Sequence, residues 1–555
     1  MLTKVASILA AIIALGLAPR APHAPRVANV RRHPVRINSR LGSEENPCPL
    51  PEDDIAAARG TPRPEPTVWE GLWHLTTPAW LADAAAPERV CAAVGRQVPE
   101  FASGTLTLRD CEVTRLRLRA TGYWTGLYRF TVEGRPSGQP EVVAVEGTLI
   151  PPGLPRPDRV DTGATFGSEG WHCYVPELRL VLQTQPPETK LAALPQLTDG
   201  EAACVLLEQS LRAGAPACHD LRLKACTPNV VRYKPGRRCT IVYDLEYPAD
   251  LAAGRPWPAR VVAKTYDGDK GRNAYLAMRA LWESSLARSR TVAVAEPLAF
   301  LPELNVLVQG PIHEEWTLNE FFRFALEAGT PEALEQLRGY LRKTGRGLAE
   351  LHQCGVRYGE PITWEDELAA IRARNAKLTA SLPQCAEAIT ALLAHLERVA
   401  AWYPPDPAGP AHRSFRPAQV LLYKNGIGFI DFDGFCQAEP ALDLALFLTE
   451  IEVLGLGQVK TGQKEGGEEA PDPDDRVGRL ARLEGLYRVF LDEYNSVSVI
   501  SVSPPRIALW AALDLITRLQ GSWTKGKLAR LTDTLFLLDC HLIDDLATHY
   551  RDAAP

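Results

Sequence analysis

The sequence predicts an α+β protein in which two sheet-rich segments precede a larger, mainly helical one. Three strand patterns fill residues 111–118, 123–132 and 141–150, and the same plan returns at 226–234, 238–247 and 260–266. From about residue 330 onward, apolar residues recur at helical spacing. Runs of strands followed by runs of helices are typical of α+β folds.

The composition limits the classes of function. The 555 residues are 46% hydrophobic and 23% charged, an ordinary globular balance that is long enough for about two to four domains. The net charge of -6 argues against nucleic acid as a partner, because phosphate binding needs a basic face. The twelve cysteines are scattered without a C-x-x-C pair, which favours reduced thiols over disulfides or a zinc site.

The amino-terminal stretch, residues 1–87, is expected to be a largely irregular arm. Residues 1–18 imitate a secretory signal, but the apolar run is short for a membrane span and Pro19 would follow the cleavage point, where proline is disfavoured. We therefore expect a cytoplasmic protein without a membrane partner, and export stays the minor alternative.

A short phrase repeats within the chain. Pro-Glu-Leu and a following Gln occur at 176–178 and 183, and again at 302–304 and 309, an offset of 126 residues (302 - 176 and 309 - 183). Together with the repeated strands, this predicts that a small lobe occurs twice, at 88–214 and 215–311. Aligning 261–264 with 142–145 gives a lysine only to the second copy, so we expect the first copy to be degenerate.

A helix is predicted between the two copies. Thr198 or Asp199 can cap its start, and Gly214 can end it. The second copy also has a helical pattern at 271–286, where the first copy has four prolines between residues 151 and 157, which exclude a helix interior.

A hairpin organises the segment from residue 412 to residue 447. Two apolar runs, 420–423 and 427–430, flank Asn425-Gly426, the strongest short signal for a tight β-hairpin. If these two residues form the turn, Lys424 faces Ile427 and Gln419 lies opposite Phe432. The hairpin would therefore bring the loop at 412–419 next to the acidic stretch at 431–433.

This layout resembles the catalytic segment of the kinase-like phosphotransferases, which include aminoglycoside phosphotransferases and choline kinases. In that group a loop H-x-D-x-x-x-x-N carries the catalytic base and a metal ligand, and an Asp beyond the hairpin holds Mg²⁺. The resemblance implies that Gln419 and Asp431 are metal ligands here. Residues 439–445 resemble the D-P-A-x-D-L-A run of the group, in which the second Asp, here Asp443, braces the catalytic loop.

The resemblance also implies a bilobal protein-kinase-like fold. Its lobes would span 215–311 and 312–555, with the degenerate, β-rich copy in front of them. We further expect a mobile loop at 459–478, which is rich in Gly, Lys and acidic residues. The helices that follow would complete the larger lobe and wall the acceptor site.

One departure from the family pattern affects the catalytic base. Ser414 stands at the position of the catalytic Asp, and a hydroxyl cannot accept a proton as a carboxylate does. General-base assistance is typically worth about 10²- to 10⁴-fold in rate. We expect Ser414 to orient the acceptor hydroxyl. His412 is expected to shape the loop, with a role as substitute base as the alternative, and Asp433 is either a second metal ligand or a solvated acid.

The nucleotide-binding residues implied by the resemblance lie in the second copy. Lys264 resembles the strand lysine that holds nucleotide phosphates, and Glu283, nineteen residues on (283 - 264), is the candidate partner acid. Three cations of the basic turn at 233–238 could meet phosphate oxygens, namely Lys234, Arg237 and Arg238, or the turn could simply be solvated. After the strand at 305–308, backbone groups of Gln309 and Ile312 would contact adenine.

The leading interpretation is an ATP- and Mg²⁺-dependent small-molecule phosphotransferase that acts on a hydroxyl-bearing acceptor, in which Ser414 in place of the catalytic Asp could weaken the activity. The alternative is a pseudokinase that binds nucleotide, or nothing, and works as an interaction or regulatory protein. A third reading is a structural helper built on the duplicated lobe.

Overall fold

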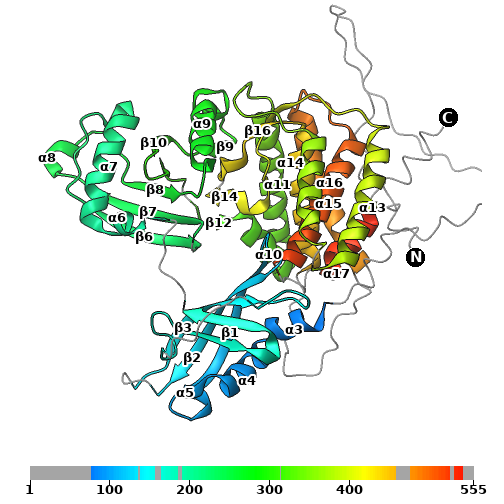
Figure 1. Ribbon diagram of the computed structural model, residues 1–555. Coiled ribbons are helices and arrows are strands. Elements are labelled where there is room, and N and C mark those ends of the chain that lie inside the picture. Colours follow the sequence, from blue (N-terminus) through cyan, green and yellow to red (C-terminus); the bar gives the residue numbers. More distant parts are fainter. Residues whose placement is uncertain are drawn as a thin grey trace, which may run out of the picture.

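The structure is a computed structural model that describes residues 77–134, 138–156, 164–184, 191–234, 236–312, 314–379, 381–424, 426–457, 476–525 and 531–541. The chain has three lobes, which we call the first lobe (79–184), the second lobe (191–309) and the large lobe (310–541). The first and second lobes are built on sheets, and the large lobe is mainly helical (Figure 1). The protein is therefore α+β, as predicted. Across the ranges given above, no helix combines the length and apolar character that crossing a membrane would require.

The first lobe is a five-stranded antiparallel sheet covered by short helices. Its elements are α3 (Ala79–Ala85), α4 (Pro87–Gln97), α5 (Pro99–Ala102), β1 (Thr107–Leu118), β2 (Trp124–Glu133), β3 (Glu141–Leu149), β4 (His172–Val175) and β5 (Leu180–Thr184), in the sheet order β1-β2-β3-β5-β4. Every second residue of β2 is buried, as expected for a sheet with one covered face. The irregular arm predicted to reach residue 87 is wrong for α3, because its Leu81 and Ala84 are buried in the core of this lobe. Residues 1–76 of that arm lie outside the described residues.

The second lobe repeats this strand order. It comprises α6 (Leu194–Thr198), α7 (Gly200–Gly214), β6 (Ala225–Lys234), β7 (Arg238–Glu246), α8 (Ala249–Ala252), β8 (Arg260–Thr265), α9 (Lys270–Glu283), β10 (Pro297–Leu301) and β11 (Val306–Gln309), in the order β6-β7-β8-β11-β10. Asp199 caps α7 by accepting a hydrogen bond from the Ala202 amide at 2.8 Å. The predicted boundary at 214 is wrong. The apolar face of α7 is buried with Leu207 and Leu211 in the core of the second lobe, so this helix belongs there.

Equivalent side chains make equivalent contacts in these two lobes. Tyr128 on β2 is fully buried and donates a hydrogen bond to the Ala84 carbonyl, and Tyr243 on β7 does the same to the Leu197 carbonyl. In both lobes the accepting carbonyl belongs to the short helix that precedes the main helix. That the two lobes arose by duplication remains a prediction.

The register corrects the predicted alignment of the two copies. Tyr128 pairs with Val145 and Tyr243 pairs with Val261, so these two residues are equivalent. Three residues further along each strand, Lys264 then corresponds to Thr148 and not to Val145. The shift arises because 142–145 and 261–264 are similar apolar runs, whereas strand position depends on cross-strand pairing.

The large lobe is a helical bundle around a small sheet. Its helices are α10 (Leu318–Ala328), α11 (Pro331–His352), α12 (Trp364–Ala376), α13 (Pro383–Ala400), α14 (Pro440–Leu456), α15 (Arg476–Val497), α16 (Pro504–Thr524) and α17 (Leu531–Cys540). Its sheet, β12-β14-β15-β9, joins β12 (Trp316–Thr317), β14 (Val420–Tyr423), β15 (Gly426–Phe429) and β9 (Val292–Val294), and β13 (Gly409–Ala411) pairs with β16 (Cys436–Ala438). A mobile loop was predicted at 459–478, and its residues 459–475 lie outside the described part of the chain. The prediction is wrong for residues 476–478, because they form the start of α15.

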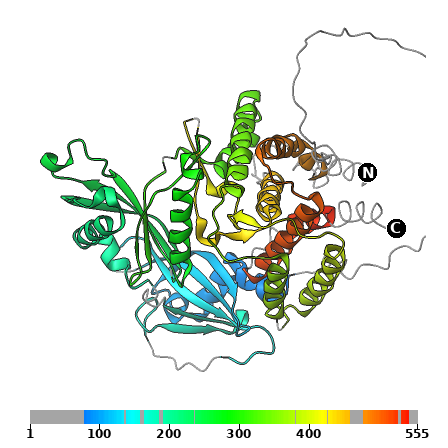
Figure 2. The ribbon, with the colours of Figure 1, turned by 90° about the horizontal axis from the view of Figure 1, so that it is seen from above.

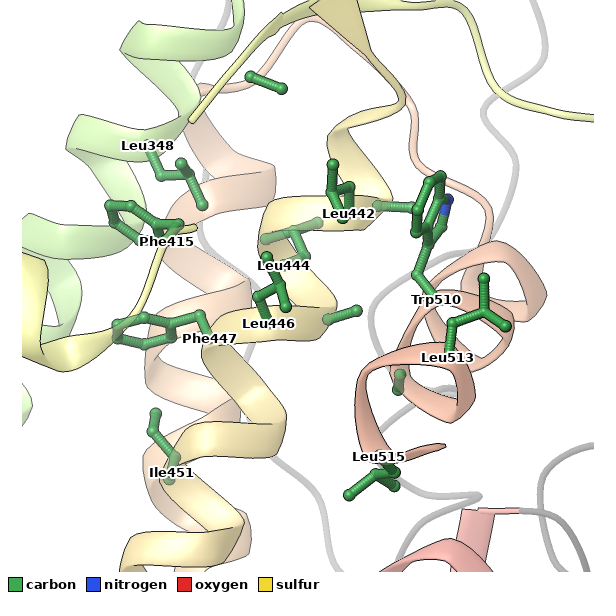
Figure 3. Packing of buried hydrophobic residues seen from close by; sticks show 14 of the residues in the cluster. Leu348, Phe415, Leu442, Leu444, Leu446, Phe447, Ile451, Trp510, Leu513 and Leu515 are labelled. Atoms are coloured by element: carbon green, nitrogen blue, oxygen red, sulfur yellow. The ribbon is translucent and has the colours of Figure 1, made fainter. Parts of the chain in front are cut away.

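The second lobe and the large lobe meet around the hairpin segment at residues 412–447. The second lobe and the helices of the large lobe lie on either side of β14, and the first lobe lies against the large lobe (Figures 1 and 2). The core of the large lobe reaches the catalytic segment from α11 and α14 (Figure 3). The site is therefore built on a rigid helical base.

Candidate active site

The catalytic hairpin forms with a register different from the predicted one. Tyr423 pairs with Gly426 and Val420 with Phe429, so Gly426 lies in β15 and not in the turn. Lys424 takes the positive φ of 47° that such a turn requires. The predicted Asn-Gly turn is thus wrong by one position, and residue 425 itself lies outside the described residues.

The corrected register still joins the loop to the acidic stretch. The Ile430 amide donates to the Gln419 carbonyl at 3.1 Å, so Gln419 faces Ile430 and not Phe432. Asp431 follows directly, in a left-handed conformation with φ 74° and ψ 48°. Aspartate tolerates this region better than most residues, and such strain often marks functional sites.

The catalytic loop is fixed by Phe415 and Asp443. The Phe415 ring is fully buried between Phe429, at a centroid distance of 4.9 Å, and Phe447, at 5.4 Å (Figure 3). The Asp443 carboxylate accepts hydrogen bonds from the backbone amides of His412 at 2.6 Å and Arg413 at 2.8 Å. Arg413 has a φ of 62°, and these amide bonds help to hold that strained turn. Asp443 therefore performs the bracing task that the resemblance implied.

Ser414 and His412 form a hydrogen-bonded pair. The His412 ring is buried, and its Nε2 lies 2.9 Å from the Ile430 carbonyl oxygen. A carbonyl oxygen only accepts, so Nε2 carries the proton and Nδ1 of the neutral ring is left as an acceptor. Ser414 Oγ lies 3.2 Å from that Nδ1, so the hydroxyl can donate to it. Ser414 is thus oriented by a histidine that can also take up a proton.

Four charged side chains from both lobes converge at the end of the hairpin. Arg238 Nη1 lies 3.1 Å from Asp431 Oδ1 and 3.0 Å from Asp433 Oδ2, so one guanidinium bridges two carboxylates. Lys264 Nζ lies 3.9 Å from the same Asp431 oxygen. Tyr266 donates its hydroxyl proton to Asp433 Oδ1 at 2.9 Å. The two aspartates are therefore the point at which the second lobe contacts the catalytic segment.

The environment separates the two aspartates in acidity. Burial opposes ionisation of Asp431, but the charges of Lys264 and Arg238 outweigh it and lower its pKa to about 2. Burial and the neighbouring Asp431 raise the pKa of Asp433 above its usual value. Asp431 is therefore ionised at neutral pH, whereas Asp433 takes up a proton more readily than an ordinary aspartate.

The expected pairing of Lys264 with Glu283 is wrong, because each of the two side chains has a different partner. Glu283 is exposed near the end of α9 and accepts from Arg279 of its own helix at 3.3 Å. Lys264 is nearly buried and has Asp431 as its carboxylate neighbour. The reason is the position of α9, which presents Asn273 to the site: its Nδ2 donates to the Asp433 carbonyl at 3.1 Å. Sequence spacing alone could not give the rotation of α9.

The basic turn and the hinge also differ in detail from expectation. Arg237 is exposed, and the next residue, Arg238, is the arginine that reaches the aspartates. Gln309 is buried in β11 and pairs with Val262 of β8. Ile312 packs over the catalytic hairpin, because a Cβ at Gly428 would lie 2.7 Å from Ile312 Cγ2. Both hinge residues thus border the site, and adenine binding by their backbone groups remains a prediction.

The donor set around Asp431 fits a divalent cation. Carboxylate and amide oxygens are the ligands that Mg²⁺ takes in proteins, and Asp431 supplies a permanent carboxylate. Gln419 Oε1 is buried and has no hydrogen-bond partner among the described residues, a state that a bound cation would relieve. No group of three or more His, Cys, Asp or Glu suited to a metal occurs in the described part of the chain, so phosphate oxygens would have to complete such a site.

Sequence reasoning named Arg238 only as one of three candidate phosphate-binding cations, and it missed Tyr266 and Asn273 as site residues. Tyr266 follows Lys264 by two residues and so shares its strand face, a signal that could have been used. Asn273 depends on helix rotation. It is held by Tyr358, whose hydroxyl donates to Asn273 Oδ1 at 2.9 Å, and nothing in the sequence marks that contact.

Comparison with known proteins gives one family match. Residues 259–476 match the model of the phosphotransferase enzyme family. None of the curated proteins matches the sequence. Among solved structures, a choline kinase from Cryptosporidium parvum Iowa II is 12% identical, with a TM-score of 0.41, over 64% of this chain and 98% of its own.

Two further solved structures have similar values. The choline kinase LicA from Streptococcus pneumoniae is 13% identical, with a TM-score of 0.38, over 63% of this chain and 99% of its own. A glucosamine kinase is 15% identical, with a TM-score of 0.39, over 84% of this chain and 99% of its own. The residues that match the family model, 259–476, include Lys264, the loop at 412–419 and both aspartates.

Proposed function

We propose that this protein is an ATP- and Mg²⁺-dependent phosphotransferase that acts on the hydroxyl group of a small molecule. The observation that carries the proposal is the convergence of Lys264, Arg238, Asp431 and Asp433 at the end of the catalytic hairpin. Phosphoryl transfer depends mainly on positioning and on neutralising charge, and these four groups supply cations and metal-ligating carboxylates at one place.

Each residue then has a defined task. Lys264 and Arg238 bind phosphate oxygens as cations, while Asp431 and Gln419 hold Mg²⁺, with Asp433 as a further ligand. The bound metal supplies charge neutralisation between the phosphates. Because Arg238 bridges both aspartates in the structure, it has to exchange them for phosphate oxygens when metal and nucleotide bind.

Ser414 and His412 take over the task of the missing catalytic aspartate. The acceptor hydroxyl donates its proton to Ser414 Oγ while the Ser414 proton moves to His412 Nδ1, and the Nε2 proton stays on its bond to the Ile430 carbonyl. Ser414 therefore gains one proton from the acceptor and loses one to His412, so its own protonation state does not change. It ends on a buried imidazolium, which costs more than protonating a carboxylate, so the reaction is slower than with aspartate.

The acceptor is a hydroxyl-bearing small molecule, and nothing in the site selects one of the chemical classes used by the kinases compared above. We place the reaction in the cytoplasm, because it consumes ATP. Residues 1–18, which carry the signal-like pattern, lie outside the described residues.

The experiment that tests this function is calorimetric titration of ATP into the full chain, with and without Mg²⁺, beside Asp431→Ala. Binding that needs Mg²⁺ and is weakened in the variant is the expected result. The absence of ATP binding under both conditions would refute the proposal.

The second candidate is a pseudokinase that binds nucleotide without transferring phosphate. The observation in its favour is the combination of Ser414 with an arginine that bridges the metal-binding carboxylates. ATP hydrolysis by the parent protein and by Ser414→Asp separates the two. Hydrolysis that rises in Ser414→Asp supports a weakened enzyme, whereas nucleotide binding without hydrolysis in either protein supports the pseudokinase.

A further inference from the structure

The hairpin that joins β1 and β2 fixes the first lobe to the large lobe. Leu118, at the end of β1, packs against both the core of the first lobe and the core of the large lobe. In the turn that follows, Gly122 is buried and its carbonyl accepts a hydrogen bond from Ser381 Oγ at 3.4 Å. Figure 1 shows this end of the first lobe reaching the helices of the large lobe. The position of the first lobe relative to the large lobe is thus fixed by this hairpin.

Cationic side chains from two lobes meet at that place. In the first lobe, Arg117 lies near the end of β1 and Arg119 directly follows that strand. In the second lobe, Lys234 ends β6 and Arg237 directly precedes β7. Burial and the charges of Arg237 and Arg119 lower the pKa of Arg117. Burial lowers the pKa of Lys234, and Arg117 is among the cations that lower it further. The two basic turns therefore lie within electrostatic reach of each other.

These cations lack acidic partners in the structure. Over the described residues, no carboxylate lies within 4.0 Å of the charged groups of Arg117, Arg119, Lys234 or Arg237. The Arg119 side chain donates a hydrogen bond to a neutral group, the Thr125 hydroxyl, at 2.7 Å. Like charges held together without counter-charges repel, and a bound anion removes that repulsion.

The backbone of β1 is shaped at this point. The strand has a register shift between Thr114 and Arg117, and Arg115 between them has a φ of 54°. A bulge of this kind bends a strand and redirects the residues that follow it, and bulges are frequent beside functional sites. The bend precedes the two arginines directly.

The β6–β7 turn connects these cations to the candidate site, because Lys234 pairs with Arg238 across the turn. Arg237 of the cluster is followed by Arg238, which bridges Asp431 and Asp433. Phosphate groups held by Arg238 and Lys264 would therefore extend next to the two turns. Several cations that act on one another suit a ligand with several anionic groups, such as a chain of phosphates, better than a single carboxylate.

We propose that Arg117 and Arg119 of the first lobe join Lys234 and Arg237 in binding the phosphate oxygens of a polyphosphate anion at the entrance to the active site. The anion is either the phosphate tail of the nucleotide or a separate phosphorylated molecule. The first alternative rests on the proposed function, and the second does not. In both, the first lobe supplies ligand-binding side chains and is more than a degenerate copy.

The test is calorimetric titration of inorganic tripolyphosphate into the full chain and into the double variant Arg117→Ala/Arg119→Ala. We expect binding to weaken by about tenfold or more in the double variant, and to depend less on salt, because two charge-assisted contacts are lost. The control is Arg129→Ala, which removes a surface arginine of the same lobe that pairs with Glu112. Arg117→Lys/Arg119→Lys should restore most of the affinity if charge is what matters.

Competition with ATP identifies the source of the anion. Tripolyphosphate that ATP displaces marks the site of the nucleotide tail, and simultaneous binding marks a separate phosphorylated ligand. Tripolyphosphate binding in Asp431→Ala, combined with loss in the arginine double variant, would uphold the inference even if ATP turnover were absent. No tripolyphosphate binding to the parent, or binding in the folded double variant within twofold of the parent, would overturn it.

Discussion

Arg238→Ala tests the bridge between the second lobe and the catalytic aspartates. In the parent protein the Arg238 guanidinium contacts carboxylates of both Asp431 and Asp433, and all three side chains are about one-fifth exposed. Removing it leaves two buried carboxylates with Lys264 as the neighbouring cation, 3.9 Å from Asp431. Two opposite consequences follow, for stability and for metal binding.

The size of the stability effect comes from the pKa of Asp431. A pKa of about 2 against the ordinary 3.8 corresponds to about 2 kcal/mol in favour of the folded, ionised state. Lys264 and Arg238 provide this together, so we expect Arg238→Ala to lose about 1–2 kcal/mol at neutral pH. This stabilisation is present above the ordinary pKa of Asp431 and is lost as pH falls through its folded value. In the variant, the loss on acidification therefore begins at a higher pH.

Metal binding should change in the opposite direction. Mg²⁺ has to displace Arg238 in the parent protein but not in the variant. We therefore expect the variant to bind Mg²⁺ about fivefold to tenfold more tightly, which corresponds to a gain of about 1–1.4 kcal/mol in binding free energy. Differential scanning fluorimetry across a Mg²⁺ series measures both effects. The variant should melt lower without metal and gain more on its addition.

The matched control is Arg260→Ala, on the strand that carries Lys264. Arg260 pairs with Asp244 on the surface, where ion pairs contribute little. An Arg238→Ala protein that behaved like this control, with unchanged melting and unchanged Mg²⁺ affinity, would refute the bridging role.

Three further predictions follow from the same contacts. Burial and the adjacent anion raise the pKa of Asp433, so we expect the Mg²⁺ affinity of the parent protein to fall on mild acidification, and Asp433→Asn should abolish this fall. Metal titrations at neutral and mildly acidic pH measure the effect, and an equal fall in the variant would contradict the prediction. Glu439→Ala should cost about 3–5 kcal/mol by leaving the buried Arg506 without its carboxylate, seen as a lower urea midpoint, with partial recovery in Glu439→Leu/Arg506→Met. Glu283→Ala should leave ATP affinity within about twofold in calorimetry, whereas Lys264→Ala should weaken it by about tenfold, since charge-assisted phosphate contacts are the strong ones.

The sequence predicts the fold well where local chemistry decides it. The strands of both small lobes lie within a few residues of their predicted positions, because alternating apolar residues and turn glycines leave little choice. Asp199 caps its helix as predicted, since a capping side chain acts within three residues. The hairpin and the two segments that it brings together, 412–419 and 431–433, were predicted, although the register of the hairpin was not.

The errors arise where packing decides between neighbours. The choice between Arg237 and Arg238 depends on which residue ends the β6–β7 turn, and that follows from cross-strand pairing. The prediction for Glu283 was wrong for a similar reason, because the rotation of α9 about its axis is set by the face that the helix buries. The residues of α7 could not show to which lobe the helix belongs, since the apolar face of an amphipathic helix does not determine which sheet it packs against.

The position of Leu118 has a consequence for how the molecule unfolds. One side chain that fills space in two hydrophobic cores couples them, because neither core can open without exposing part of the other. The first lobe is therefore expected to exchange its amide hydrogens together with the large lobe and not as an independent unit on a tether. Deleting it would also expose apolar surface on the large lobe, so a shortened protein would tend to associate through that patch.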